Sequence, residues 1–259
     1  MKKPIILGID IGNTSVSLGI IKEGEVLETF FVDSNLSVRA FHSNLNDVLK
    51  KIKHKYPVIE RIVICSVVPD VLLRVLYLTQ KCLKQAPLLI GRDIIVPIKN
   101  NYKNPKQVGQ DRLVCAYAAK KLYGYPVIVI DFGTAITFDV VNKRGAYDGG
   151  IIVPGIRLSA ESLFNKTALL PRIETINAPS QLVGQDTASS ILSGLFFGYG
   201  AMSQRLIDLL CDELETKAKT IVTGGYTDMM EKFLHKKIHK IDKDLVFKGM
   251  DLLYMERLK

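Results

Sequence analysis

The hydrophobic residues of the chain follow alternating and helical spacings that divide it into strands and helices. Residues 5–32 contain three strand-like runs separated by short turns: an apolar run that ends at Asp10, an alternating run at 16–20, and a third run at 26–32. This pattern predicts a meander of three antiparallel strands. In residues 37–54 the apolar positions recur about every 3.6 residues, which predicts a helix. The run at 61–68 is apolar at nearly every position, as in a strand covered on both faces of a sheet.

Similar patterns continue to the end of the chain. Helices are predicted at 69–84, 113–122, 156–170, 187–210, from 227 and, as a short segment, at 244–250. Strands are predicted at 88–90 and 220–226, as a hairpin at 127–140, and as a short strand between glycine-rich turns at 145–155. The polar segment 92–108 is typical of a surface loop. This order of elements predicts a mixed α/β fold.

Two turns leave buried strands with the same residue types. They contain Asp10, Gly12, Asn13 and Thr14 in the first case, and Asp131, Gly133 and Thr134 in the second. A carboxylate, a backbone without Cβ and a hydroxyl at a strand end suit a phosphate with its magnesium ion. One Asp-x-Gly turn is common in ordinary hairpins. Two copies about half a chain apart favour two similar domains that face each other across a cleft and hold phosphates from both sides.

Composition and charge narrow the class of protein. The chain has 259 residues, of which 47% are hydrophobic and 24% charged, as in soluble globular proteins of one large or two medium domains. Its formal net charge of +9 would suit a nucleic-acid partner. However, the lysines are scattered, and the dense run at 50–55 reads as the solvated face of a helix. We therefore expect no nucleic-acid partner.

The cysteines and the N-terminus indicate the compartment. The four cysteines are well separated and form no Cys-x-x-Cys pair, which favours free thiols over disulfides or a zinc site. The apolar run after the N-terminus is short and ends at Asp10, so we expect no signal peptide. No run approaches the roughly 20 apolar residues of a membrane span. We expect a cytoplasmic protein that does not contact membranes.

Asp111 and Arg112 stand at the start of a predicted helix and allow two interpretations. Asp111 could be an N-cap and Arg112 a solvated residue of the first turn. Alternatively, Asp111 accepts a proton from a substrate while Arg112 binds a substrate carboxylate through two parallel hydrogen bonds. The residue pattern alone leaves both open.

Two further segments combine small residues with regular structure. Gly224 and Gly225 lie between a strand and a helix, where backbone amides and open space suit a phosphate or a flat ring, although an ordinary turn also uses glycine. The helix at 187–210 contains many small residues. It suits either a buried central helix or close packing against a second subunit.

The order of these motifs resembles the type III pantothenate kinases, within the actin, sugar-kinase and heat-shock-ATPase superfamily. The resemblance covers nearly the whole chain and rests on residues 10–14, 66–69, 102–105 with 109–112, 131–135, 149–150 with 154–155, 187–194, 223–225 and 245–249. It implies two similar mixed-sheet domains of the actin-like, ribonuclease H-like type flanking a central cleft, at residues 1–115 and 116–259.

The resemblance also implies an activity and its cofactors. The family phosphorylates pantothenate to 4'-phosphopantothenate with ATP and Mg²⁺, the first committed step of coenzyme A synthesis. Its members are homodimers that require a monovalent cation, K⁺ or NH₄⁺. No Walker A sequence is present, which speaks against a P-loop mechanism.

Individual residues take roles from the same resemblance. Asp111 would be the general base on the pantothenate hydroxyl, and Arg112 would hold its carboxylate. The residues implied in substrate binding are Tyr102, Gly109, Gln110, Asp111, Arg112 and, from the partner subunit, Thr187. Those implied in binding ATP are Asp10, Gly12, Asn13, Thr14, Gly133, Thr134, Gly224 and Gly225. Asp131 would lie near the monovalent cation, and Asp10 would hold magnesium.

Two other functions remain open from the sequence. The chain could phosphorylate another small substrate, as sugar and acetate kinases of the superfamily do. It could also be a nucleotide-binding accessory or regulatory protein without phosphate transfer. Asp111 beside both phosphate turns favours catalysis, because a regulator would be free to lose it.

Overall fold

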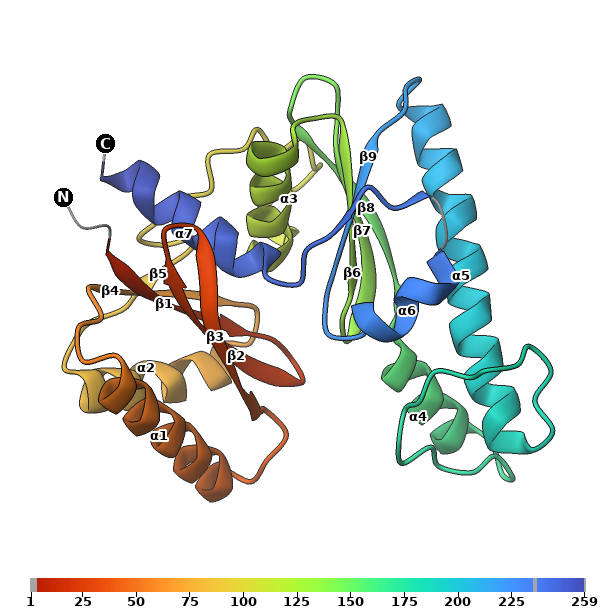
Figure 1. The fold of residues 1–259 in the computed structure, drawn as a ribbon, viewed down its shortest axis with the longest axis horizontal. Helices are drawn as coiled ribbons and strands as arrows, with labels where there is room; N and C mark the ends of the chain where they lie inside the picture. The colour runs from red at the N-terminus through yellow and green to blue at the C-terminus, as the bar shows by residue number, and fades with distance from the viewer. Residues whose placement is uncertain (1–3, 235–236, 259) are drawn as a thin grey trace. The chain divides into compact units, whose positions relative to one another are not determined.

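The computed structural model describes residues 4–234 and 237–258, drawn in Figure 1. Its strands are β1 (Ile5–Ile11), β2 (Ser15–Lys22), β3 (Glu25–Asp33), β4 (Arg61–Ser66), β5 (Leu88–Leu89), β6 (Val127–Phe132), β7 (Ala135–Val141), β8 (Tyr147–Pro154), β9 (Lys219–Thr223) and β10 (Lys240–Ile241). Its helices are α1 (Val38–Lys55), α2 (Pro69–Leu83), the 3₁₀ turn η1 (Pro105–Gln107), α3 (Gln110–Tyr123), α4 (Ile156–Lys166), α5 (Thr187–Glu213), α6 (Thr227–Leu234) and α7 (Leu245–Arg257).

The strands of the described residues form two five-stranded sheets with the same plan. The orders are β3-β2-β1-β4-β5 and β10-β9-β6-β7-β8. In each, a central strand, β1 or β6, pairs with an antiparallel meander on one side and a parallel strand on the other. The predicted fold class of two similar mixed-sheet α/β units is therefore confirmed at the level of strand order. The two glycine turns occupy equivalent places, because each follows the central strand of its sheet. Asp10 and Asp131 lie one residue before the end of those strands, β1 and β6.

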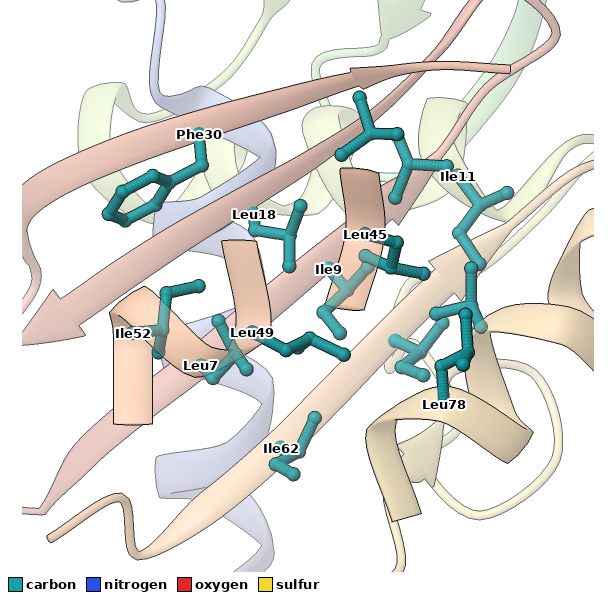
Figure 2. Packing of buried hydrophobic residues seen from close by; sticks show 14 of the residues in the cluster. Leu7, Ile9, Ile11, Leu18, Phe30, Leu45, Leu49, Ile52, Ile62 and Leu78 are labelled. Atoms are coloured by element: carbon teal, nitrogen blue, oxygen red, sulfur yellow. The ribbon is translucent and has the colours of Figure 1, made fainter. Parts of the chain in front are cut away.

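Helices α1 and α2 cover one face of the first sheet (Figure 1). Figure 2 shows side chains of β1 and β2 meeting Leu45 and Leu49 of α1. Leu45 and Leu49 are fully buried. Their spacing of four residues places them on one side of the helix, as the 3.6-residue pattern predicted. Ser37 caps α1 by accepting a hydrogen bond from the Ala40 N–H at 3.3 Å.

Helix α7 packs on the opposite face of the first sheet, against glycines. A Cβ built at Gly8 would lie 2.9 Å from Met250 Sδ, and one at Gly19 would lie 2.9 Å from the Phe247 ring. A Cβ at Gly249 would likewise lie 2.9 Å from the carbonyl oxygen of Val114 in α3. Gly8 and Gly19 let α7 approach the sheet closely, and Gly249 lets α7 approach α3. The last helix has thirteen residues and is longer than the short segment predicted.

The second sheet has its own core, to which α4, α5 and α6 contribute. One side of α5 is buried along its length, through Ser193, Phe196, Gly200, Ser203 and Ile207. Phe196 and Phe197 both contact Phe233 of α6, with ring centroids 5.4 and 4.8 Å apart. The regular spacing of the buried positions explains why α5 is continuous despite its small residues.

Three predicted boundaries were wrong. Helix α3 begins at Gln110, three residues earlier than predicted, and the glycines at 149 and 150 lie inside strand β8 and not in a turn. Helix α4 ends at Lys166, well before Pro171. There the Thr167 hydroxyl donates to the carbonyl of Leu163 at 2.8 Å, a local bond that competes with helix continuation. Strand β10 was missed because it has only two residues.

The contacts divide the chain into two compact units. The first runs up to Ile98 and adds Lys103–Ala118 and the residues from Asp244 onward; the second comprises Lys99–Tyr102 and Ala119–Lys243. The predicted domain boundary at residue 115 stays a prediction, although α7 packs with the first sheet. Among the described helices, none has the length and apolar character needed to cross a membrane.

Candidate active site

The first phosphate turn joins β1 to β2. Asp10 lies near the end of β1, and the Gly12 N–H donates to the Ser15 carbonyl at 3.0 Å, which closes the turn. Ser34, just after β3, donates its N–H to the Thr14 carbonyl at 3.0 Å and its hydroxyl to the Gly12 carbonyl at 3.2 Å. Ser34 was not predicted from the sequence, since only the meander brings it beside the turn. These bonds fix the backbone of the turn around Asn13, which is exposed.

The charges of Asp10 and Asp111 both act on a buried thiol in the first unit. Cys65 of β4 is the parallel register partner of Asp10 and is fully buried. Burial raises the pKa of the Cys65 thiol well above its usual value, and the charges of Asp10 and Asp111 raise it further. The thiol therefore stays protonated beside the two carboxylates. Nothing in the sequence pattern singled out Cys65, because the β1–β4 pairing creates this neighbourhood.

Asp111 lies within the first turn of α3 and is not its N-cap. The Leu113 N–H donates to the carbonyl of Gly109 at 3.3 Å, so Gly109 occupies the capping position. A Cβ at Gly109 would overlap Oδ1 of Asp111. That oxygen accepts from the Arg112 N–H at 2.8 Å. Glycine at position 109 therefore leaves space for the Asp111 carboxylate at the helix N-terminus.

Gln110 and Arg112, the two neighbours of Asp111 in α3, have different surroundings. Gln110 packs over Gly91, where a built Cβ would lie 2.9 Å from Gln110 Cδ. Gly91 has φ +87°, a conformation that glycine adopts readily. Arg112 is half-buried. Its planar guanidinium offers five N–H donors, which is the geometry suited to a carboxylate.

The second phosphate turn joins β6 to β7. Asp131 lies in β6, and the Gly133 N–H donates to the Ala135 carbonyl at 3.1 Å. The Gly155 N–H donates to the Thr134 carbonyl at 3.0 Å, and a Cβ at Gly155 would overlap that oxygen. Gly155, which follows β8 directly and is the N-cap of α4, therefore packs against the turn. Thr134 is exposed at the tip.

Gly224 and Gly225 lie beside Asp131, as β9 runs parallel to β6. Asp131 is the register partner of Thr223. Gly224 has φ +100°, and a Cβ there would overlap Oδ1 of Asp131 and lie 2.6 Å from the Phe132 nitrogen. Thr227, the first residue of α6, donates its hydroxyl to the Gly224 carbonyl at 2.7 Å. Nothing lies within 4 Å of a Cβ at Gly225, so open space adjoins this turn.

Tyr102 and Thr187, the two remaining candidates, both belong to the second unit. Tyr102 is half-buried and lies against Gly149 of β8, where a built Cβ would be 3.1 Å from Tyr102 Cε2. Thr187 is exposed as the first residue of α5, after the N-cap Asp186, whose Oδ1 accepts from the Ser189 N–H at 2.8 Å. Thr187 therefore faces outward at a helix start.

The structure thus brings together two groups of the predicted residues. The first unit joins Asp10, Cys65 and the Asp111 region; the second joins Asp131, Gly133 and Gly224. No cluster of three or more His, Cys, Asp or Glu side chains with metal-ligand geometry occurs in residues 4–234 and 237–258. The Asp131 carboxylate, with the space that Gly133 and Gly224 leave beside it, fits a cation that takes its other ligands from phosphates and water.

Comparison with known proteins decides the family. The profile of the type III pantothenate kinase family matches residues 6–209. The chain is 41% identical over 251 residues to a type III pantothenate kinase of Sulfurihydrogenibium sp. (strain YO3AOP1), covering 96% of this chain and 99% of that one. It is 41% identical over 252 residues to the type III pantothenate kinase of Persephonella marina, covering 96% and 98%. The chain belongs to the type III pantothenate kinase family.

Solved structures agree with the fold of this type III pantothenate kinase family member. A conserved Baf family protein from Campylobacter jejuni matches with a TM-score of 0.59 and 21% identity over 97% of this chain and 98% of that one. The ethanolamine utilization protein EutJ from Carboxydothermus hydrogenoformans matches with a TM-score of 0.56 and 13% identity, over 98% and 91%. At these identities the matches support the fold alone.

Proposed function

We infer that the chain is a pantothenate kinase, which transfers phosphate from ATP to pantothenate in coenzyme A synthesis. The match of the family profile across residues 6–209, with relatives 41% identical over nearly their whole length, carries this conclusion. The cytoplasm remains the compartment expected from the sequence.

We propose that Asp111 accepts the proton of the pantothenate hydroxyl while Arg112 holds the carboxylate of the same substrate. The position of Asp111 supports this role. Gly109 leaves space for the Asp111 carboxylate, and the backbone N–H of Arg112 donates a hydrogen bond to Asp111 Oδ1 at 2.8 Å. The Arg112 guanidinium suits paired hydrogen bonds to a carboxylate. Neighbouring residues of α3 would thus orient the acceptor and remove its proton.

We propose that the two glycine turns bind the phosphates of ATP. The turn at 10–14 and the turn at 131–134 each place backbone N–H groups and a threonine hydroxyl after a carboxylate. Gly224 and Gly225 would lie beside the adenosine, since open space adjoins Gly225. Phosphoryl transfer depends mainly on such positioning and on charge stabilisation.

We propose that Asp10 holds Mg²⁺ and that Asp131 lies near a monovalent cation, K⁺ or NH₄⁺. Magnesium is commonly bound by one or two carboxylates together with substrate phosphates, which fits Asp10 near the end of β1. When bound, the metal neutralises charge on the transferring phosphate. Asp131 has space created by Gly133 and Gly224, whose built Cβ atoms would crowd its Oδ1.

The function is tested by ADP release from purified protein with ATP and Mg²⁺. We expect turnover that requires pantothenate and that falls when Na⁺ replaces K⁺. The acceptor panel should include a sugar and other small hydroxy acids as controls. Turnover with one of these and none with pantothenate would contradict the assigned substrate. Equal rates in K⁺ and Na⁺ would contradict the cation proposal alone.

We also propose a homodimer in which Thr187 enters the partner's pantothenate site. Gly194 and Gly198 lie on α5 outside its buried face, and nothing in the described chain lies within 4 Å of a Cβ at either position. Small residues there would allow a second subunit to approach closely.

We expect light scattering to give twice the chain mass for the wild type, and a lower mass for Gly198→Glu. Lys50→Glu on α1 is the matched surface control, and a monomeric wild type would contradict the proposal.

A further inference from the structure

The segment Lys99–Tyr102 is attached to the edge strand β8 of the second sheet. The Tyr147 N–H donates to the Lys99 carbonyl at 2.8 Å, and the Asn101 N–H donates to the Tyr147 carbonyl at 2.8 Å. Asn100 forms a parallel bridge with Tyr147. Both backbone groups of Tyr147 are therefore used to hold this segment, and Tyr102 follows it directly.

Tyr147 is itself anchored inside the sheet. Its hydroxyl donates to Oδ1 of Asp139 at 2.7 Å, and the Thr137 hydroxyl donates to Oδ2 of the same carboxylate at 3.0 Å. Tyr147 is fully buried and Asp139 is 1% exposed. A carboxylate buried this deeply is strongly destabilising unless its oxygens accept hydrogen bonds. The pair therefore holds Tyr147, and with it the backbone that carries Lys99–Tyr102.

Gly149 then determines where the Tyr102 ring can lie. A Cβ at Gly149 would be 3.1 Å from Tyr102 Cε2 and 3.2 Å from Cδ2, closer than ordinary contact. Gly149 has φ +122° and lies where the β7–β8 register shifts. The Tyr102 N–H donates to Asn100 Oδ1 at 3.0 Å, which turns the chain toward Gly149. The Tyr102 ring therefore packs directly against the backbone of Gly149, with no side chain between them.

We propose that Gly149 and the buried Tyr147–Asp139 pair are positioning residues that place the Tyr102 ring and thereby set the affinity for pantothenate. The inference rests on the proposed pantothenate kinase activity and on the substrate-binding role that the family resemblance implies for Tyr102. It assigns these residues no contact with substrate. They act through Tyr102, so their effect must disappear when the Tyr102 ring is absent.

Gly149→Ala tests the inference by a double-mutant cycle with Tyr102→Ala. We expect Gly149→Ala to raise the KM for pantothenate by about tenfold, within the range of coupling energies between contacting residues. The KM for ATP should be unchanged. In the Tyr102→Ala background the same substitution should raise the pantothenate KM no further. Tyr147→Phe, which removes only the hydroxyl, should likewise raise the KM for pantothenate and leave the KM for ATP unchanged.

Gly124→Ala is the matched control for backbone strain. Gly124 also has positive φ, +83°, but nothing lies within 4 Å of its Cβ. The Gly124→Ala variant should have a lower melting temperature, as Gly149→Ala should, but an unchanged KM for pantothenate. Equal increases in both KM values, or additive effects of Gly149→Ala and Tyr102→Ala, would overturn the inference.

Failure of the proposed function gives a different result. If the wild type shows no pantothenate-dependent turnover, the substrate assignment is wrong, and positioning is then judged from crystal structures of the wild type and Gly149→Ala. A Tyr102 ring displaced from its place over residue 149 would support the positioning role. An unmoved ring would overturn it. If the wild type is pantothenate-dependent but Tyr102→Ala leaves the KM unchanged, the inference is overturned while the function stands.

Discussion

Asp111→Asn should lower kcat by at least ~100-fold, the lower bound expected for loss of a general base. The amide cannot accept the proton of the pantothenate hydroxyl. It keeps the shape of the carboxylate, and its oxygen can still accept the Arg112 N–H bond that Asp111 Oδ1 accepts at 2.8 Å. We therefore expect near-normal stability and near-normal ATP affinity, measured by calorimetry, beside a greatly reduced rate of ADP release.

Asp70→Asn is the matched control for this substitution. Asp70 is also an acidic residue in the first turn of a helix of the first unit, α2, and is exposed. Both substitutions remove one negative charge near a helix N-terminus, which costs a similar small amount of stability. Only Asp111→Asn should reduce kcat. Near-wild-type turnover of Asp111→Asn would contradict the assignment of the general base, and an equal loss in both variants would assign the effect to helix stability.

Local chemistry in the sequence predicted the central strands and both turns. Ile5–Ile11 and Val127–Phe132 are apolar enough to be central strands. The Asp near the end of each strand, followed by glycine and a hydroxyl residue, marks a tight turn. The repetition predicted two similar units, and both sheets do have the same strand order. These features depend on neighbouring residues, which is why periodicity and turn chemistry suffice to find them.

Features that depend on distant pairing could not be predicted. The packing of α7 on the first sheet depends on Gly8 and Gly19, more than 200 residues earlier in the chain. Cys65 reaches Asp10 only through the parallel β1–β4 register. The support of the second turn by Gly155 arises in the same way. A sequence pattern specifies which residues face a core but not which strand lies alongside.

In the candidate site, too, local residue patterns could be predicted and contacts between distant residues could not. The residue pattern pointed to both turns and to the Asp111–Arg112 pair, and the resemblance gave them roles. The structure places Asp131 beside Gly224 and Asp10 beside Cys65. The interpretation of Asp111 as an N-cap was wrong, because α3 begins one residue before it. The roles of Thr187 and of the cations stay predictions, since they concern a second subunit and bound ions.

Gly224→Ala should lower kcat/KM for ATP by about 100-fold, which corresponds to roughly 2.7 kcal/mol and lies within the range for overpacking a tight contact. A Cβ at this position would overlap Oδ1 of Asp131 and lie 2.6 Å from the Phe132 nitrogen. Backbone strain at φ +100° adds to the overlap. The chain can relieve both only by moving the Gly224 turn or the Asp131 carboxylate away from the second phosphate turn. ATP affinity, measured by calorimetry, should therefore fall together with kcat/KM.

Gly24→Ala separates backbone strain from the contact. Gly24 has φ +81° in the β2–β3 turn, and the nearest atom to a built Cβ is 3.9 Å away. Gly24→Ala should lower the free energy of unfolding by about 1 kcal/mol, as expected for one residue forced into a left-handed conformation. It should leave the affinity for ATP unchanged. If Gly224→Ala binds ATP as the wild type does, the strand-to-helix turn after β9 is not part of the nucleotide site. If both variants lose ATP affinity equally, loss of global stability explains the result, and the role of Gly224 beside Asp131 must be abandoned.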